Sequence, residues 1–408
     1  MDEILFIAHR IPFPPDRGDK IRSHHSLKAL ARLAPVHVAT LGETDADLAA
    51  EPLLATLAES HLLARRTSSL VAAGVRALAS GKPVSLTAFD SPQLRQWIAH
   101  TLATRPIGTI FVFSGQMGQY VPDSFAGRVV VDLCDVDSAK FEAYAAARRS
   151  PRAWIDAREA GLLAAEERRL AARADTTLLI SEAEAALLRS RIGETTGTVR
   201  AIGNGIDTAT FAPATTAPHP ALLAQPGPHL VFTGQMDYPP NIAAVRRAAT
   251  AIMPAIRAAH PKAHFHVVGR APAGEVRALE GLNRTRVWGE VPDVKPFLAA
   301  ADLVLAPLTL ARGVQNKVLE AMAMARSVVL TSAAATGIEA THGEHLLIGD
   351  SDAELISHAL DLIATPEQGL KMGNAARRFV VQHKSWDAAL APLAGFLGRA
   401  SAEARNAA

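Results

Sequence analysis

Residues 303–323 read LVLAPLTLARGVQNKVLEAMA and combine a strand, a turn and a helix. Leu303–Ala306 is a short apolar run typical of a buried strand, and the apolar residues at the end of the stretch recur with helical spacing. Gly313 stands between them, where it permits a tight turn and a close approach of the backbone to a ligand. Lys317 and Glu320 are three residues apart and share one helix face. The pattern predicts a crossover unit of a parallel sheet with a polar site at the end of its strand.

The same alternation of short apolar runs and helical segments extends along the whole chain. We expect helices at about residues 20–33, 241–260 and 314–325. The expected strands are Ile4–Ala8, Val36–Leu41, Thr109–Phe113, Val129–Leu133, Thr176–Ile180, His229–Thr233, His264–Val268, Arg286–Trp288, Leu303–Ala306, Val328–Thr331 and Leu346–Ile348. Strands that alternate with helices of ten or more residues are typical of parallel sheets covered on both faces. The chain is therefore predicted to be an α/β protein with two doubly wound, Rossmann-like domains.

A proline-rich stretch separates the two halves of the chain. We predict a first domain over residues 1–205, a linker over 206–228 and a second domain over 229–385. Residues 386–408 are predicted to form a C-terminal helix that crosses back to the first domain. The prolines of the linker are Pro213, Pro218, Pro220, Pro226 and Pro228. Two such domains joined by a hinge commonly bind a ligand at the carboxyl ends of their strands.

The composition excludes several classes of function. The 408 residues include 42 Lys and Arg against 40 Asp and Glu, a net charge of +2, whereas nucleic-acid binding needs a concentrated basic surplus. Cys134 is the single cysteine, so neither an internal disulfide nor a zinc cage is expected. The most apolar stretch, Phe297–Leu308, is shorter than the roughly 20 residues of a membrane span. The N-terminus lacks the basic region of a signal peptide, so we expect a soluble, cytoplasmic protein.

Two segments of the first half are candidates for a polar site. Residues 12–22, PFPPDRGDKIR, run from a strand end into a helix N-terminus, which suits an anion, with Gly18 and Arg22 as candidate ligands. The alternative is a proline-stiffened loop capped by Asp19. Asp135 and Asp137 follow a strand and are candidates for a substrate contact, with metal binding and helix capping as alternatives. No G-x-G-x-x-G or P-loop pattern follows the opening strand of either half, which disfavours a dinucleotide enzyme.

In the second half, five segments together resemble the donor domain of glycosyltransferase family 4, which has the GT-B fold. They occur in the family's order and extend from the predicted domain boundary to the Lys317 helix. In the first half, the Gly18 loop and the Asp135 segment resemble sugar transferases of exosortase/PEP-CTERM exopolysaccharide systems. The five segments are VRAIGNGID at 199–207 with FAP at 211–213, FTGQMDYPPN at 232–241, VVG at 267–269, VWGEVPDV at 287–294, and the helix with Lys317 and Glu320.

The resemblance implies a retaining, metal-independent hexosyltransferase without a cofactor. Its donor would be a nucleoside diphosphate sugar, and its acceptor a saccharide or polyprenyl-linked molecule in cell-surface glycan synthesis. By this resemblance Glu320 accepts hydrogen bonds from the ribose. The other implied donor-binding residues are Gly18, Arg22, Gly234, Gly289, Glu290, Val291, Arg312, Gly313 and Lys317, and Asp135 and Asp137 are the candidate catalytic residues.

Three positions depart from the family pattern. Arg312 occupies the place of a Glu that contacts the donor sugar in many members, and residues 235–241 lack the usual Arg and Lys pair. We infer that Arg312 and Lys317 supply the cationic clamp instead, since a diphosphate needs counter-charge. Cys134 replaces a common His at the end of a first-domain strand. These departures keep two alternatives open, namely a catalytically inactive sugar-nucleotide-binding scaffold and a GT-B nucleotide-sugar epimerase.

The arginines between Arg148 and Arg173 predict a basic helical surface. Such a surface suits a peripheral contact with the inner face of the cytoplasmic membrane. The alternative is a solvated helix stabilised by i,i+4 ion pairs.

Overall fold

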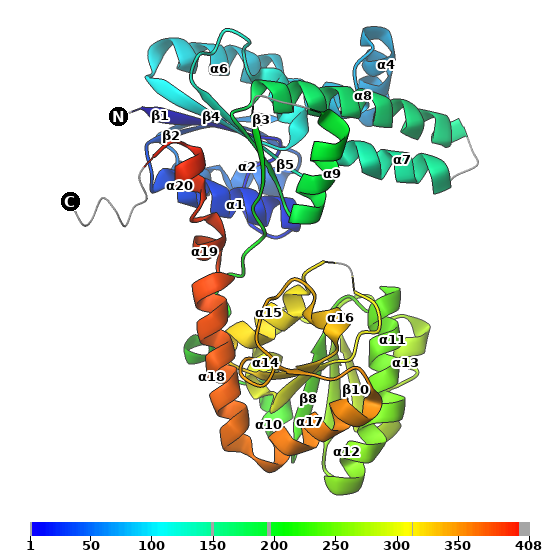
Figure 1. The fold of residues 1–408 in the computed structure, drawn as a ribbon. Coiled ribbons are helices and arrows are strands. Elements are labelled where there is room, and N and C mark those ends of the chain that lie inside the picture. The colour runs from blue at the N-terminus through cyan, green and yellow to red at the C-terminus, as the bar shows by residue number, and fades with distance from the viewer. Residues whose placement is uncertain (1, 148–150, 194–196, 312, 400–408) are drawn as a thin grey trace, which may run out of the picture. The chain divides into compact units, whose positions relative to one another are not determined.

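The computed structural model describes residues 2–147, 151–193, 197–311 and 313–399, which form two compact units (Figure 1). Unit 1 holds the described residues of 1–204 and 389–408, and unit 2 holds residues 205–388.

In the described part of unit 1, seven strands form one parallel sheet in the order β3-β2-β1-β4-β5-β6-β7. Helices α1 and α6 lie on opposite faces of this sheet (Figure 1). The strands are β1 Glu3–Ala8, β2 Val36–Gly42, β3 Ser60–Arg65, β4 Ile107–Phe113, β5 Arg128–Cys134, β6 Thr176–Leu179 and β7 Thr198–Ala201. The helices are α1 Gly18–Ala31, α2 Asp45–Ala49, α3 Glu51–Ala55, α4 Leu70–Ser80, α5 Val84–Ala88, α6 Pro92–Thr104, η1 Gly115–Tyr120, α7 Asp137–Ala147, α8 Pro151–Arg173, α9 Glu182–Ile192 and α20 Leu393–Phe396.

Unit 2 repeats this architecture, with a parallel sheet of six described strands in the order β10-β9-β8-β11-β12-β13. The strands are β8 His229–Thr233, β9 His264–Val268, β10 Thr285–Gly289, β11 Leu303–Ala306, β12 Ser327–Leu330 and β13 Leu347–Ile348. The helices are η2 Pro213–Thr215, α10 Pro220–Leu223, α11 Pro239–Arg247, η3 Ala248–Ile252, α12 Met253–Ala259, α13 Gly274–Arg277, η4 Leu282–Arg284, α14 Lys295–Ala300, α15 Asn316–Ala323, α16 Ser332–Ala335, α17 Asp352–Ala364 and α18 Pro366–His383, and α19 Trp386–Leu390 follows.

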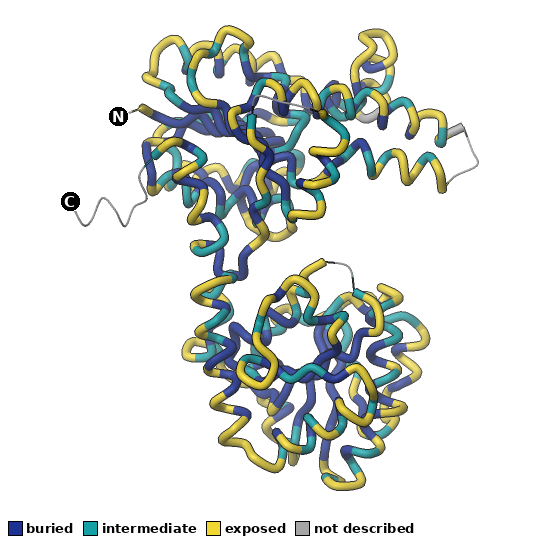
Figure 2. Tube along the Cα trace, in the orientation of Figure 1, coloured by how far each residue is buried: buried dark blue, intermediate teal, exposed yellow. Residues whose placement is uncertain are grey.

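The sheets form the cores of both units, as the dark blue strands in Figure 2 show. Every residue of β1, β8 and β9 is buried, because helices cover both faces of a parallel sheet and its central strands meet no solvent. This requirement explains why the predicted strands appear in the sequence as continuous apolar runs. The predicted α/β class and the two doubly wound domains are confirmed.

The structure also adds the two edge strands of unit 1, β3 and β7, which are absent from the predicted strands. β3 lies at the edge of its sheet, and most of its residues are only half-buried. Its sequence, SHLLAR, therefore lacks the apolar run that marks the central strands.

Two predicted segments differ from the structure. Residues 206–228 do not form a separate linker, because Ile206 and Leu222 are buried in the core of unit 2. The continuous helix predicted from residue 386 is instead two short helices, α19 and α20, since Pro392 between them cannot donate the hydrogen bond that a helix interior requires. Residues from Ala389 onward belong to unit 1, where Arg399 donates hydrogen bonds to the carbonyl oxygens of Asp2 and Leu33.

Candidate functional site

A pocket of about 510 Å³ lies within unit 2 at the carboxyl ends of β8, β9 and β10. The N-terminal turns of α11 and α15 form its other walls. Ligands bind at this edge in doubly wound folds, because strand-end loops and helix N-termini meet there. The lining residues are Thr233, Gly234, Gln235, Tyr238, Asn241, Gly269, Arg270, Glu290, Val291, Val294, Val314, Gln315, Asn316, Lys317 and Glu320.

Two glycines let the strand-end loops of this pocket touch. Gly269 has φ +152°, and a Cβ atom built on it would lie 1.6 Å from the carbonyl oxygen of Gly234. A Cβ on Gly234 would in turn lie 2.9 Å from Nδ2 of Asn241 and 3.1 Å from Nζ of Lys317. Backbone therefore forms this wall of the pocket and leaves room for a ligand beside Lys317.

Lys317 is the cation at the start of α15. Its Nζ atom donates a hydrogen bond to Oδ1 of Asn241 and lies 4.4 Å from the centre of the Phe232 ring. Burial lowers the pKa of Lys317 to about 8, an effect that the charge of Glu320 opposes. The ammonium is therefore still mostly protonated at neutral pH, and a bound anion would replace part of its lost hydration.

Glu320 lies one turn after Lys317 and lines the same pocket. Burial raises the pKa of Glu320, and the charge of Lys317 acts against that rise. The side chain of Gln315, the N-cap residue of α15, makes no capping hydrogen bond to the helix and instead donates to the carbonyl oxygen of Gly313. The positive end of the α15 dipole thus faces the pocket together with Lys317, which favours an anionic ligand.

Arg270 supplies a second cation to the pocket, and the sequence analysis does not predict it. It directly follows Gly269, and its Nη2 atom donates a hydrogen bond of 3.0 Å to Oε1 of Gln235. One sequence feature could have identified Arg270 as a site residue: it is a basic residue just beyond the end of a buried strand. Asn241 is also absent from the predicted site residues, although it belongs to a quoted motif.

The predicted site residues of the second half fall in this one region. Gly234, Glu290, Val291, Lys317 and Glu320 all line the pocket. The other two described ones, Gly289 and Gly313, have φ values of +71° and +66° and precede lining residues. Arg312 lies outside the described residues.

In unit 1, Arg22 is part of the interior. Its Nε atom donates a 2.8 Å hydrogen bond to Oδ2 of Asp132, and Nη1 donates to the carbonyl oxygen of Ile202 and to Oδ1 of Asn204. The Arg22 side chain is 2% exposed. These contacts indicate a structural role within unit 1, where Arg22 joins α1 to the ends of β5 and β7.

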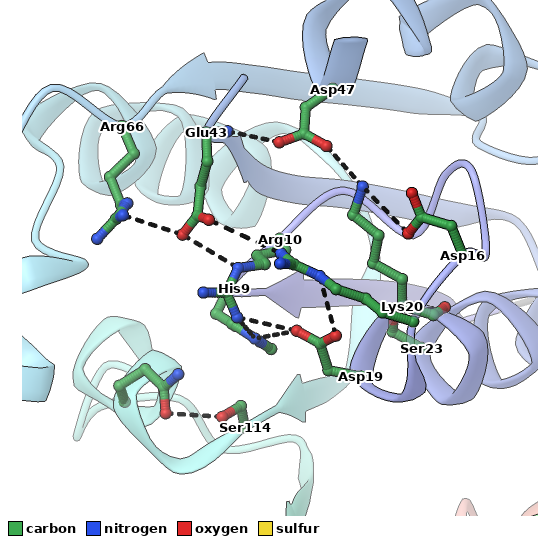
Figure 3. A network of polar contacts seen from close by, with 12 residues as sticks. His9, Arg10, Asp16, Asp19, Lys20, Ser23, Glu43, Asp47, Arg66 and Ser114 are labelled. Atoms are coloured by element: carbon green, nitrogen blue, oxygen red, sulfur yellow. Dashed lines mark hydrogen bonds and ion pairs between the residues drawn. The ribbon is translucent and has the colours of Figure 1, made fainter. Parts of the chain in front are cut away.

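The helix expected after the proline loop begins at Gly18, which is exposed. Asp19 is not its cap: the N-cap residue is Arg17, and Asp19 lies inside the first turn. The Asp19 carboxylate instead belongs to a network of charged side chains at the end of β1 (Figure 3).

That network centres on His9, which is buried and stacks on Phe113 with ring centres 5.9 Å apart. Nε2 of His9 lies 3.2 Å from Oδ2 of Asp19, and Nη1 of Arg10 contacts both residues. Although burial opposes ionisation, the hydrogen bond with His9 and the charges around it hold the pKa of Asp19 well below its usual range. Glu43 joins the network through ion pairs with Arg10, Arg17 and Arg66 (Figure 3). The sequence analysis does not predict this network.

Asp135 and Asp137 lie beyond the end of β5, where they line a pocket of about 20 Å³ in unit 1 together with Glu166 and Glu167. Burial raises the pKa of Asp137, while Lys140, at 3.7 Å, opposes the rise. Asp135 is exposed. Burial also raises the pKa of the Cys134 thiol well above its usual value, so this side chain is a neutral thiol.

Metal-binding clusters and membrane-spanning helices are both absent from the described residues. No group of three or more His, Cys, Asp or Glu side chains there is arranged to hold a metal ion. No helix among them is both long enough and apolar enough to cross a membrane.

Residues 227–365 match the model of a protein family described as "Glycosyl transferases group 1". The matched segment contains every residue that lines the pocket of unit 2. No curated protein sequence matches the chain.

Several solved structures share the fold over the full chain. HepE of Anabaena, solved with UDP and glucose, has a TM-score of 0.58 at 15% identity, over 98% of this chain and 100% of HepE. Sucrose-phosphate synthase of Thermosynechococcus elongatus has a TM-score of 0.57 at 17% identity over 100% of both chains. The trehalose 6-phosphate synthase of Burkholderia multivorans has a TM-score of 0.57 at 12% identity, also over 100% of both. The chain therefore has the GT-B fold.

Proposed function

From the GT-B fold and the glycosyltransferase group 1 segment, we propose that the protein is a glycosyltransferase that uses a nucleoside diphosphate sugar as its donor. The observation that carries the proposal is the pairing of Lys317 and Glu320 on the first turns of α15, both lining one pocket. A cation at a helix N-terminus suits a diphosphate, and a carboxylate one turn later suits the hydroxyl groups of a ribose. HepE binds UDP and UDP-glucose, which supports a donor of this class.

The pocket residues would act mainly on the leaving diphosphate. Negative charge accumulates on it as the glycosidic bond to the sugar breaks, and preorganised cations and N–H dipoles stabilise that charge where water is excluded. Lys317 and Arg270 are the described cations of the pocket. Glu290 and Val291 follow β10 and would lie beside the base.

The finer assignment is a hexosyl transfer with retention of configuration and without a metal ion. In this proposal the departing diphosphate assists attack of the acceptor on the same face of the sugar. The acceptor would be a saccharide or polyprenyl-linked molecule of cell-surface glycan or exopolysaccharide synthesis, which places the reaction in the cytoplasm. Asp135 and Asp137 remain the proposed sugar-side residues.

A thermal-shift panel with UDP, GDP, ADP, dTDP and NAD tests the donor site. We expect one diphosphate to stabilise the protein, by about 2.7 kcal/mol at a hundred times its dissociation constant. The shift should fall to about half or less in Glu320→Ala and persist in Glu367→Ala, whose carboxylate lies exposed on α18. No shift with any diphosphate would contradict the proposal. Stabilisation without release of diphosphate from a sugar donor and acceptor would instead indicate a binding scaffold.

A further inference from the structure

Helix α4 of unit 1 exposes three large apolar side chains and buries two alanines. Val71, Val75 and Leu78 are 80%, 64% and 62% exposed, and their spacing of four and three residues places them on one face. Ala73 and Ala77, on the opposite face, are fully buried. An ordinary surface helix buries its large apolar residues, so this inverted arrangement indicates that the outer face of α4 has a partner.

The chain segment that contains α4 is basic in sequence, although Arg65 and Arg66 in it pair with Asp45 and Glu43. Between Glu59 and Asp90 the sequence contains four Arg and Lys residues and no Asp or Glu. Two of these bases, Arg76 and Lys82, line a pocket of about 360 Å³ beside the end of α4. Its one carboxylate, Asp90, accepts a hydrogen bond of 2.7 Å from Arg95. Arg76 also donates hydrogen bonds to Oγ of Ser68 and to the carbonyl oxygen of Thr87, and both Arg76 and Lys82 remain exposed.

Several arginines of α8, the basic helix predicted as a membrane contact, bind other groups of unit 1. On α8, Arg158 donates hydrogen bonds to the carbonyl oxygens of Ala77 and Lys82, which fastens α8 to the end of α4. Arg169 pairs with Glu166, and Arg173 donates to carbonyl oxygens of a neighbouring loop. Arg148 and Arg149 lie outside the described residues. These three arginines of α8 thus serve packing within unit 1, whereas Arg152 and Arg168 of the same helix are exposed.

One turn before Arg158, the N-terminal part of α8 carries an exposed aromatic side chain, Trp154. The polar N–H and apolar body of Trp suit the boundary between water and hydrocarbon. Arg158, one turn later, joins this part of α8 to the end of α4.

We propose that the outer face of α4, formed by Val71, Val75 and Leu78, docks on the surface of an anionic lipid bilayer. The apolar side chains enter the headgroup boundary, and Arg76 and Lys82 meet the lipid phosphates. Apolar burial and electrostatic attraction are the two contributions that hold an interfacial helix on anionic lipid. The attraction falls with rising salt, because mobile ions screen charges at the surface. This docking is independent of the donor site in unit 2.

Co-sedimentation of the full chain with vesicles tests the docking surface. We expect binding to phosphatidylcholine vesicles that contain phosphatidylglycerol, weak binding to phosphatidylcholine alone, and a loss of binding as salt is raised. The variant Val75→Asp/Leu78→Asp should bind the anionic vesicles at least about tenfold more weakly, and Arg76→Gln/Lys82→Gln should lose the preference for anionic lipid.

The matched control is Leu370→Asp/Val381→Asp, which changes the same residue types on α18, where they are 59% and 43% exposed. It should bind like the wild-type chain. The proposal is overturned if the wild-type chain does not sediment with anionic vesicles, or if the α4 and α18 variants bind equally. It is also overturned if light scattering shows a wild-type dimer that Val75→Asp/Leu78→Asp converts to a monomer, because a second copy then covers α4.

Discussion

Gly269 packs its α-carbon directly against the carbonyl group of Gly234, so closely that a Cβ atom would lie 1.6 Å from the carbonyl oxygen. The N–H of Gly234 donates to the carbonyl oxygen of Val268, and that of Gly269 donates to Gly289. The loops after β8, β9 and β10 are thereby joined through their backbones, in addition to the side-chain hydrogen bond between Arg270 and Gln235. These backbone contacts position Arg270 and the pocket wall beside Lys317.

Gly269→Ala should therefore damage both the stability and the donor pocket of unit 2. The added methyl group forces the two loops apart, and φ of +152° is strained for alanine. We expect a loss of about 2–5 kcal/mol in the free energy of unfolding, measured with urea. Gly274→Ala is the control, since no atom lies within 4 Å of its Cβ position. Equal effects of the two substitutions would contradict the role given to Gly269.

The pKa of Lys317, lowered by burial to about 8, predicts how donor affinity depends on pH. An anion binds the protonated ammonium, so affinity should be constant near neutral pH and weaken above about pH 8, by up to about tenfold per pH unit. Lys317→Arg should bind independently of pH over this range, because a guanidinium stays protonated. Calorimetric titration with the nucleotide sugar from pH 7 to pH 10 measures both. A wild-type affinity that is flat across this range would rule out Lys317 as the diphosphate ligand.

Glu320 should discriminate between nucleotides that differ only in their ribose hydroxyl groups. Hydrogen bonds to a charged group contribute about 1.5–3 kcal/mol, so Glu320→Gln should weaken binding of the ribonucleoside diphosphate roughly tenfold or more. The 2′,3′-dideoxy analogue should bind the wild-type and variant proteins about equally. If Glu320→Gln weakens both ligands to the same extent, the carboxylate supports the pocket rather than the ribose.

Much of the fold can be predicted from the sequence, because the central strands are buried on both faces. β1, β8 and β9 are therefore mostly apolar, and such runs are visible without a structure; their polar members are Glu3, His229, Thr233, His264 and His266. The edge strand β3 is only partly buried, so it need not be apolar, and a search for apolar runs does not identify it. The helical pattern around Pro392 predicts one continuous helix, whereas the proline separates α19 from α20.

The candidate site is less predictable, because its contacts join distant segments. Lys317 and Asn241 are 76 residues apart, and they meet only because β8 and β11 are neighbours in the sheet. For Arg22 the sequence instead predicts a role that the structure does not support. An arginine beside a glycine-containing loop resembles an anion ligand, but this side chain is buried within unit 1. Its partner Asp132 is 110 residues away, and no local pattern reveals that pair.

The Arg22–Asp132 pair predicts a difference between two aspartates that are three residues apart. Both side chains of the pair are 2% exposed, so Asp132→Asn would leave a buried guanidinium without its counter-charge. We expect a loss of about 3–5 kcal/mol in the free energy of unfolding. Asp135→Asn, at an exposed position, should change it by less than about 0.5 kcal/mol. Denaturation of both variants followed by circular dichroism makes the comparison, and similar losses would refute the structural role of Arg22.

A chain of neutral histidines makes unit 2 sensitive to acid. Nε1 of Trp288 donates to Nδ1 of His266, whose Nε2 lies 3.0 Å from Nδ1 of His229, and Nε2 of His229 lies 3.2 Å from the carbonyl oxygen of Gln225. Since Trp288 can only donate, Nδ1 of His266 accepts and its Nε2–H donates, so both rings are neutral. Burial, together with the neighbouring His229, lowers the pKa of His266 to about 3.

Because the folded-state pKa of His266 lies below its unfolded value of about 6.5, the unfolded chain binds the proton more readily at intermediate pH. The stability that neutral His266 contributes is thus complete above about pH 6.5 and is lost as the pH falls towards 3, by at most about 1.4 kcal/mol per pH unit. His266→Gln keeps an acceptor for Trp288 and a donor for His229 but does not titrate. Urea denaturation between pH 7 and pH 4 should therefore show a shallower loss of stability in this variant. Parallel pH profiles for the variant and the wild-type protein would show that the acid sensitivity arises elsewhere.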